Sequence, residues 1–112
     1  RRIYTTRVPL GLISCITPFN HPMNQVVHKI APAIATNNTV VLKPSEKTPL
    51  SAYYFAQLAL DCGLPPNMLN VINGADVQAT AEMMTIHPEI TMVSFTGGSK
   101  VGKIIASKAG YR

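Results

Sequence analysis

Three short stretches of this chain combine chemically capable side chains with a position directly after an apolar run. They are residues 17–20, 43–46 and 96–99, which read T-P-F-N, K-P-S-E and T-G-G-S. In the first stretch, Asn20 carries a side-chain amide, which can donate a hydrogen bond to an oxyanion that develops during a reaction. An Asn after a strand is also a common turn residue or helix cap, so the pattern alone leaves both interpretations open.

The second stretch places a cation and an anion three residues apart, at Lys43 and Glu46. Such a donor and acceptor can bracket the hydroxyls of a nucleotide ribose. A Glu in that role repels a 2′-phosphate and so favours NAD over NADP, although Lys43 and Lys47 could also meet a phosphate. The alternative is a surface loop with a solvated ion pair.

In the third stretch, Gly97 and Gly98 stand before Ser99 at the start of an expected helix. A turn of this kind exposes backbone N–H groups to an anion such as a phosphate. The alternative is a tight turn in which glycine supplies a positive φ angle. The sequence contains neither the G-x-G-x-x-G dinucleotide fingerprint nor the Walker A pattern.

The apolar pattern predicts four strands alternating with four helices, which would position these stretches. The strands are expected in the second half of 8–16 and at 39–42, 69–72 and 91–95, and the helices within 23–36, 48–63, 76–87 and 100–108. Pro32 predicts a kink or a short irregular turn, Thr48 an N-cap before Pro49, Gly63 a helix end and Asp76 an N-cap. This alternation predicts an α/β fold with a doubly wound parallel sheet. Ligands bind at the carboxyl ends of strands in such sheets, so we expect the three stretches to share one edge.

Composition narrows the classes of protein that remain. The chain has 112 residues, of which 46% are apolar and only 13% charged, which excludes a disordered tail. So few charges suit a small free-standing domain poorly, and the chain begins with Arg1, so we expect an internal segment of a longer protein. The net charge of +5 is scattered, and we therefore expect no nucleic-acid partner.

Apolar runs and cysteines exclude further classes. No stretch of 18 apolar residues occurs, so we expect neither a signal peptide nor a membrane span. Cys15 and Cys62 are too few for a disulfide framework, and neither has His or Cys at metal-ligand spacing. We therefore expect no metal site and a reduced, cytoplasmic location.

Four stretches in order resemble the cofactor-binding domain of the aldehyde dehydrogenase superfamily. They are P-L-G-L-I-S-C-I-T-P-F-N at 9–20, K-I-A-P-A-I-A-T-N-N-T-V-V-L-K-P-S-E-K-T-P-L-S-A at 29–52, G-L-P-P-N-M-L-N-V-I-N-G at 63–74 and F-T-G-G-S-K-V-G-K at 95–103. The resemblance implies that residues 1–112 form part of a Rossmann-like dinucleotide-binding domain, in a family that lacks the usual glycine fingerprint. It also implies that the catalytic domain with the Cys nucleophile lies outside this chain.

The resemblance further implies an enzyme that oxidises a small aldehyde to a carboxylic acid with NAD, or alternatively NADP, through a Cys thiohemiacetal and thioester. Asn20 matches the oxyanion-stabilising Asn of the family. The positions that match cofactor-binding residues are Ile16, Thr17, Pro18, Phe19, Lys43, Ser45, Glu46, Phe95, Gly97, Gly98, Ser99 and Val101. A homo-oligomer is expected for the full-length protein.

Two positions depart from the usual family text, because Phe19 stands where Trp is common and Gly98 where Ser is common. The stretch P-F-N-H-P-M-N at 18–24 and the Gly97-Gly98 pair resemble the lactaldehyde, phosphonoacetaldehyde and non-phosphorylating glyceraldehyde-phosphate dehydrogenases. Neither Cys15 nor Cys62 matches the family nucleophile, so we expect the segment alone to be inactive. Two alternatives are a non-catalytic nucleotide-binding module and a structural or interaction fragment.

Overall fold

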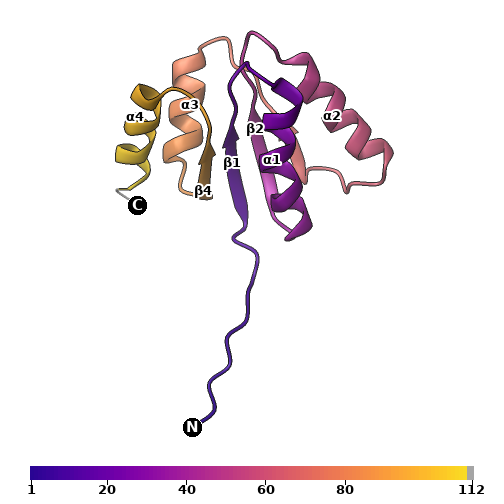
Figure 1. The fold of residues 1–112 in the computed structure, drawn as a ribbon, viewed down its shortest axis with the longest axis vertical. Helices are drawn as coiled ribbons and strands as arrows, with labels where there is room; N and C mark the ends of the chain where they lie inside the picture. The colour runs from indigo at the N-terminus through magenta and orange to yellow at the C-terminus, as the bar shows by residue number, and fades with distance from the viewer. Residues whose placement is uncertain (111–112) are drawn as a thin grey trace.

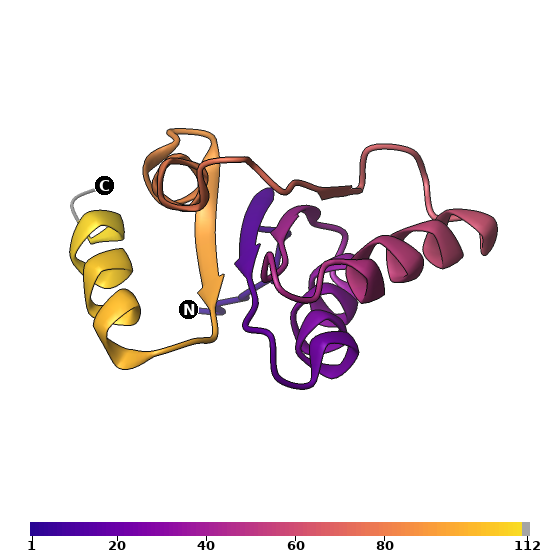
Figure 2. The same cartoon turned by 90° about the horizontal axis from the view of Figure 1, so that it is seen from above.

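A computed structural model of the chain describes residues 1–110 and shows a parallel four-stranded sheet with helices on both faces (Figures 1 and 2). The elements are β1 (Leu12–Ile16), α1 (Pro22–Ala35), β2 (Thr39–Lys43), α2 (Leu50–Asp61), β3 (Leu69–Val71), α3 (Val77–Ile86), β4 (Ile90–Phe95) and α4 (Ser99–Ala109). The strand order is β3-β2-β1-β4, with every neighbouring pair parallel. This confirms the predicted fold class and the order of elements. Residues 111 and 112 of the expected 1–112 segment lie outside the described residues.

The two faces of the sheet carry separate apolar cores. On the face covered by α1 and α2, the buried residues are Ile13, Cys15, Val26, Ile30, Ala33, Val40, Leu42 and Ala52. On the face covered by α3 and α4, they are Ile16, Met84 and Ile105, with Val41, Ala81, Val93 and Phe95 packed against them. Successive strand residues point to opposite faces, so a strand covered on both faces must be apolar almost throughout. The text L-I-S-C-I of β1 meets that requirement.

Residues that end helices behave largely as the sequence predicts. Gly63 has φ 92°, and the N–H groups of Gly63 and Leu64 bond the carbonyls of Leu60 and Ala59. This pairing is a Schellman motif, and it closes α2 before the following loop. The carboxylate of Asp76 accepts from the N–H groups of Gln78 and Ala79 at 2.9 Å, which confirms the predicted N-cap of α3.

Asn38 has a larger structural role than ending a helix. Its side chain is buried, and its Oδ1 accepts from the N–H groups of Leu10 and Gly11 at 2.6 and 3.0 Å. Its amide nitrogen donates to Ala33 and to Thr36 at the end of α1. One side chain therefore joins the entry to β1 with the end of α1.

One local prediction is wrong, and one of the two alternatives at Pro32 is excluded. Thr48 does not cap α2, because Pro49 occupies the N-cap position and the Thr48 hydroxyl donates elsewhere. Pro32 introduces no irregular turn: α1 runs unbroken to Ala35, and Ala33 remains packed in the core directly after the proline.

The first ten residues form an extended arm that projects away from the sheet (Figure 1). The arm is exposed throughout and includes Ile3, Tyr4 and Val8 among its apolar side chains. Within residues 1–110, no helix combines the length and the apolar character that a membrane span requires.

Candidate functional site

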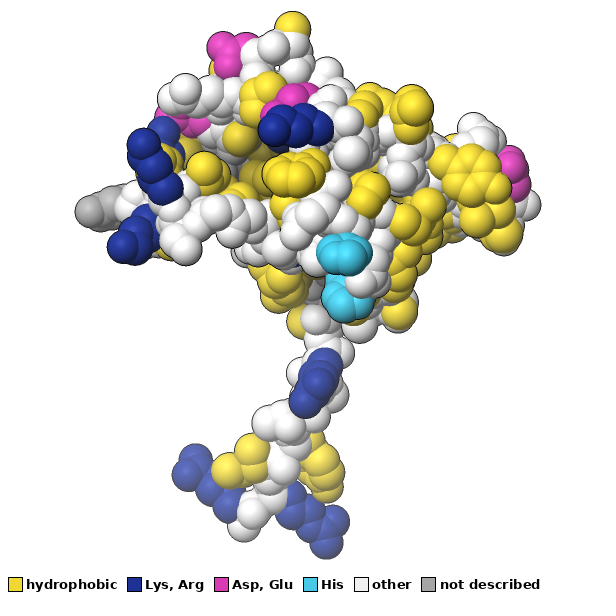
Figure 3. Space-filling model, turned by 45° about the horizontal axis from the view of Figure 1, so that its top comes forward, with side chains coloured by type: hydrophobic (Ala, Val, Ile, Leu, Met, Phe, Trp, Pro, Cys, Tyr) yellow, Lys and Arg dark blue, Asp and Glu magenta, His cyan; other side chains and the backbone are white. Residues whose placement is uncertain are grey.

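The loops that follow β1, β2 and β4 leave the sheet at one edge, which is the top edge in Figure 1. Backbone bonds join them directly: the N–H of Thr17 donates to the carbonyl of Lys43, and the N–H of Thr96 to that of Ile16, both at 3.1 Å. Because β1 lies between β2 and β4 and all three are parallel, the predicted convergence is confirmed. Figure 3, in which this edge comes forward, shows basic, acidic and apolar side chains close together on it.

The loop after β1 passes from the core to the surface within four residues. Ile16 and Thr17 are buried, Pro18 is half-buried, and Phe19 and Asn20 are exposed. The N-cap of α1 is His21, at φ 52°, so Asn20 is not the helix cap that the sequence left open. Its amide therefore lies at the surface of the shared edge.

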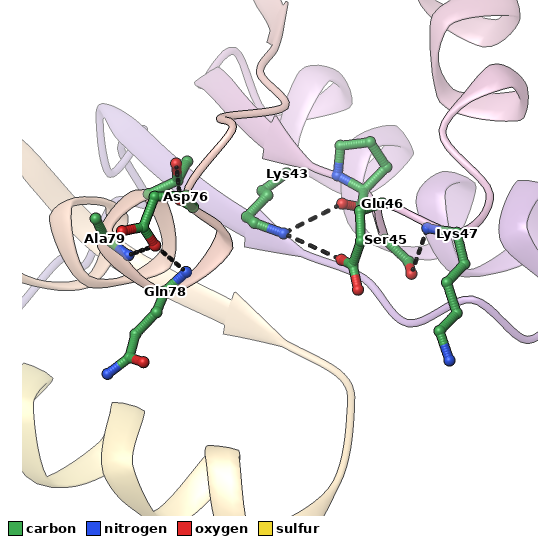
Figure 4. A network of polar contacts seen from close by, with 9 residues as sticks. Lys43, Ser45, Glu46, Lys47, Asp76, Gln78 and Ala79 are labelled. Atoms are coloured by element: carbon green, nitrogen blue, oxygen red, sulfur yellow. Dashed lines mark hydrogen bonds and ion pairs between the residues drawn. The ribbon is translucent and has the colours of Figure 1, made fainter.

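The loop after β2 differs from a solvated surface loop, because Lys43 is only 4% exposed. Its Nζ lies 3.8 Å from Oε2 of Glu46 and 3.5 Å from the carbonyl of Pro44 (Figure 4). Both contacts are long for hydrogen bonds from an ammonium group, so the group can still donate to a closer partner. Ser45 is buried, and its hydroxyl accepts from the N–H of Lys47 at 3.3 Å, which holds the turn that carries Glu46.

The same loop contacts the loop after β1 through Lys47 and Thr48, neither of which was predicted to contact Phe19. Nζ of Lys47 lies 5.0 Å from the ring centroid of Phe19. The hydroxyl of Thr48 donates to the carbonyl of Phe19 at 3.4 Å. From the sequence, Thr48 was predicted to cap a helix and Lys47 was a cation that could meet a phosphate. Neither residue carries a local signal for a contact to Phe19.

The glycines after β4 serve steric rather than torsional needs. Neither Gly97 nor Gly98 has a positive φ, so the alternative of a turn that requires one is wrong. A Cβ at Gly97 would lie 2.5 Å from the ring of Phe95, and one at Gly102 would lie 3.3 Å from it. Gly97 is therefore needed because the Phe95 ring packs beneath the turn.

Gly98 occupies the N-cap position of α4, and no side chain caps that helix. A Cβ at Gly98 would meet nothing within 4 Å, so the loop leaves open space there. The first N–H groups of a helix lack partners within the helix and attract anions. This end of α4 can accept the phosphate predicted for Gly97, Gly98 and Ser99.

A mostly apolar cleft of about 380 Å³ lies between α3 and α4. Its lining residues are Val77, Gln78, Ala81, Glu82, Thr85, Val101, Ile104, Ile105 and Lys108. Sequence analysis assigned only Val101 to the site. The pairs Val77 with Ala81 and Val101 with Ile105 have the spacing of one helix face, but the facing of two helices is not visible in a single sequence. An ion pair between Lys108 and Glu82 joins the two helices beside the cleft.

Two titratable groups lie on the face of the sheet that α1 covers: Cys15 on β1 and Lys29 on α1 itself. Burial raises the pKa of the Cys15 thiol to about 11, partly offset by the nearby Lys29. Burial likewise lowers the pKa of Lys29, whose Nζ donates to the hydroxyl of Ser94 at 3.2 Å. A thiol that resists ionisation is a poor nucleophile. Among residues 1–110, no group of three or more His, Cys, Asp or Glu side chains could hold a metal ion.

Comparison with known proteins gives a consistent result. The model of the aldehyde dehydrogenase family matches residues 1–112. A phenylacetaldehyde dehydrogenase from Pseudomonas fluorescens is 47% identical over 109 residues, which cover 97% of this chain and 22% of the relative. A lactaldehyde dehydrogenase from Methanocaldococcus jannaschii is 40% identical, covering 100% of this chain and 25% of the relative. This chain thus spans about a fifth to a quarter of the length of these curated relatives.

Solved structures show the same likeness. A crystal structure of a mutant aldehyde dehydrogenase from Pseudomonas syringae, complexed with NAD⁺ and octanal, aligns with a TM-score of 0.89 at 48% identity. The alignment covers 94% of this chain and 21% of that protein.

Proposed function

This chain belongs to the aldehyde dehydrogenase family, and we propose that it is part of the dinucleotide-binding domain of an enzyme that oxidises an aldehyde to a carboxylic acid with NAD. One observation carries the proposal: the three loops meet at one edge of the sheet, and the cleft between α3 and α4 begins there, because these helices follow β3 and β4 and start at that edge. In open α/β sheets, this edge is where dinucleotides bind. The catalytic domain with the Cys nucleophile lies outside residues 1–112 in this proposal.

The residues of the loop after β2 and of the start of α4 would fit a dinucleotide. Two side chains, Lys43 and Glu46, would hold the hydroxyls of the adenosine ribose. The ammonium group of Lys43 has only long contacts, and the carboxylate of Glu46 is exposed. Ser45 supports the turn that carries Glu46. The uncapped start of α4, at Gly97, Gly98 and Ser99, would receive the pyrophosphate.

The adenine ring of the cofactor would occupy the apolar cleft beside Val101, because a flat ring packs well between apolar helix faces. Phe95 supports this arrangement from below, because its ring packs against Gly97 and Gly102. When bound, NAD would supply the hydride acceptor.

The loop after β1 would meet the reacting end of the cofactor. Residues Ile16 to Phe19 would form the wall beside the nicotinamide, and Asn20 would donate to the oxygen of the thiohemiacetal that the nucleophile forms. The nucleophile itself must come from elsewhere. Cys15 is fully buried with a raised pKa, and Cys62 lies at the far end of α2, so neither can attack a carbonyl at this edge.

The finer features of the protein are also proposals. NAD is preferred to NADP because Glu46 disfavours a 2′-phosphate. The chain resembles both a phenylacetaldehyde and a lactaldehyde dehydrogenase, so the aldehydes to test include aromatic and small hydroxylated ones. Free Cys15 and Cys62 support a reducing, cytoplasmic location, and the exposed apolar side chains support assembly into a homo-oligomer.

The test is NAD reduction by the full-length protein with a panel of small and aromatic aldehydes. The absorbance of the NADH formed measures the rate. We expect turnover by the full-length protein and none by the 112-residue segment. Turnover by the purified segment would contradict the assignment of the nucleophile to another part of the protein. A full-length protein that binds NAD but oxidises none of the aldehydes would favour a non-catalytic nucleotide-binding module.

A further inference from the structure

Two side chains of the loop after β2 contact the loop that carries Asn20. The Lys47 ammonium lies over the ring of Phe19, and the Thr48 hydroxyl donates to the carbonyl of Phe19. Phe19 directly precedes Asn20 and is 54% exposed, so the core does not hold it in place. The contacts to Lys47 and Thr48 supply the restraint that burial does not.

We infer that Lys47 and Thr48 are positioning residues, which hold Phe19 and thereby fix the Asn20 amide for oxyanion stabilisation. This inference rests on the proposed function. The two catalytic tasks of the edge, cofactor binding after β2 and oxyanion binding after β1, are thus joined by side-chain contacts as well as by the sheet.

The behaviour of Thr48 supports this assignment. A threonine before a helix ordinarily bonds an N–H group of the first helical turn. Here α2 begins without any side-chain cap, and the hydroxyl is directed across to Phe19 instead. The contact spans 29 residues of sequence, which a purely local role in starting α2 would not require.

The Lys47 ammonium contacts the ring of Phe19 and not the neighbouring carboxylate. Lys47 adjoins Glu46 in sequence, yet the Glu46 carboxylate pairs with Lys43, at 3.8 Å. The Lys47 ammonium is thus positioned over the negative face of an aromatic ring. This leaves the Glu46 carboxylate directed toward Lys43, as ribose binding requires.

The first experiment measures hydrogen–deuterium exchange by mass spectrometry on the full-length protein without cofactor. We expect peptides covering residues 17–21 to exchange several-fold faster in Lys47→Met and Thr48→Val than in the wild type. Lys47→Arg keeps a cation over the ring and should restore slow exchange. Lys103→Met removes an exposed lysine of α4 and serves as the matched control. Unchanged exchange at 17–21 in both variants would overturn the inference.

The second experiment is a kinetic double-mutant cycle with Asn20→Ala. An exposed cation–π contact is worth about 0.5–1 kcal/mol, so Lys47→Met should lower kcat by about two- to five-fold, with little change in the KM for NAD. In the Asn20→Ala background the same change should have no further effect on kcat. An equal fall in both backgrounds would overturn the positioning role.

A rise in the KM for the cofactor at unchanged kcat would also overturn it, because that pattern indicates a direct contact from Lys47 to a cofactor phosphate. If the full-length protein reduces no NAD with any aldehyde, the proposed function fails. The exchange experiment then decides by itself whether Lys47 and Thr48 hold the loop.

Discussion

Asn20 and Lys43 occupy opposite environments at the same edge, and this difference sets what each can do. Asn20 is exposed, so its amide is accessible from the solvent. Lys43 is buried, with its ammonium group held only by long contacts to Pro44 and Glu46. An amide at a solvent boundary suits a transient negative charge, whereas a buried cation suits a ligand that excludes water around it.

The oxyanion role that we propose for Asn20 predicts a loss of turnover when its donor is removed. Replacing Asn20 by Ala should lower kcat of the full-length enzyme by about 10²- to 10³-fold, because one oxyanion donor is lost. Asn20→Asp keeps the size of the side chain but has no N–H group, so it should lower kcat at least as far. Steady-state kinetics with a saturating aldehyde measure both. A normal kcat in either variant would remove the oxyanion role.

The ribose-binding role that we propose for Lys43 predicts a loss of cofactor affinity instead. Lys43→Met keeps most of the apolar stem and removes the charge, so the fold should remain while the KM for NAD rises roughly tenfold or more. The reason is that a hydrogen bond from a charged donor to the ribose disappears. Initial rates at varied NAD test this expectation. A fall in kcat at constant KM for NAD would contradict it.

At the scale of elements, the end of α1 and the entry to β1 depend on one buried side chain. Asn38→Ala would leave the N–H groups of Leu10 and Gly11 and the carbonyl of Ala33 without their side-chain partner. Losing these bonds should lower the free energy of unfolding by about 2–3 kcal/mol. Asn24→Ala, at an exposed position of α1, is the matched control and should change it by less than about 0.5 kcal/mol.

Urea-induced unfolding of the two variants beside the wild type measures this difference. If Asn38→Ala unfolds at the same urea concentration as Asn24→Ala, water replaces the amide without loss, and the junction does not depend on it.

The element order could be predicted from sequence because each strand and helix has a local signature. Apolar β-branched runs mark β2 and β4, and residues such as Asp76 and Gly63 mark helix ends through their own backbone and side-chain chemistry. Thr48 was interpreted wrongly because the carbonyl of Phe19, which accepts from its hydroxyl, is brought to it by the fold. A single sequence shows that a threonine can cap a helix, but not that a carbonyl 29 residues away competes for its hydroxyl.

The same contrast holds for the candidate site. The three loops could be predicted to meet, since parallel strands place their carboxyl ends at one edge. The cleft between α3 and α4 could not be predicted in the same way. Its shape depends on how Val77 and Ala81 of one helix face Val101 and Ile104 of another, and those pairs are distant in sequence.

At the scale of the whole molecule, the sheet separates the site from a sealed interior. Cys15 lies in the core beneath α1 and α2, and burial raises the pKa of its thiol to about 11 against 9.0 for an unburied thiol. The unfolded chain therefore loses the Cys15 proton at a lower pH than the folded chain. Between pH 9 and 11 the folded state binds more protons, so the stability that Cys15 contributes falls as the pH rises through this window.

Cys15→Ala should remove this part of the alkaline destabilisation. The difference in free energy of unfolding, variant minus wild type, should increase by up to about 2–3 kcal/mol between pH 9 and pH 11, because the variant loses less stability over this range. Burial also lowers the pKa of Lys29, which contributes with the opposite sign in both proteins and so largely cancels in the difference. Cys62→Ala, at an exposed cysteine, is the control and should follow the wild type. Urea unfolding at fixed pH values between 8 and 11 measures the three proteins, and parallel pH profiles for all of them would show that the core beneath α1 admits water to Cys15.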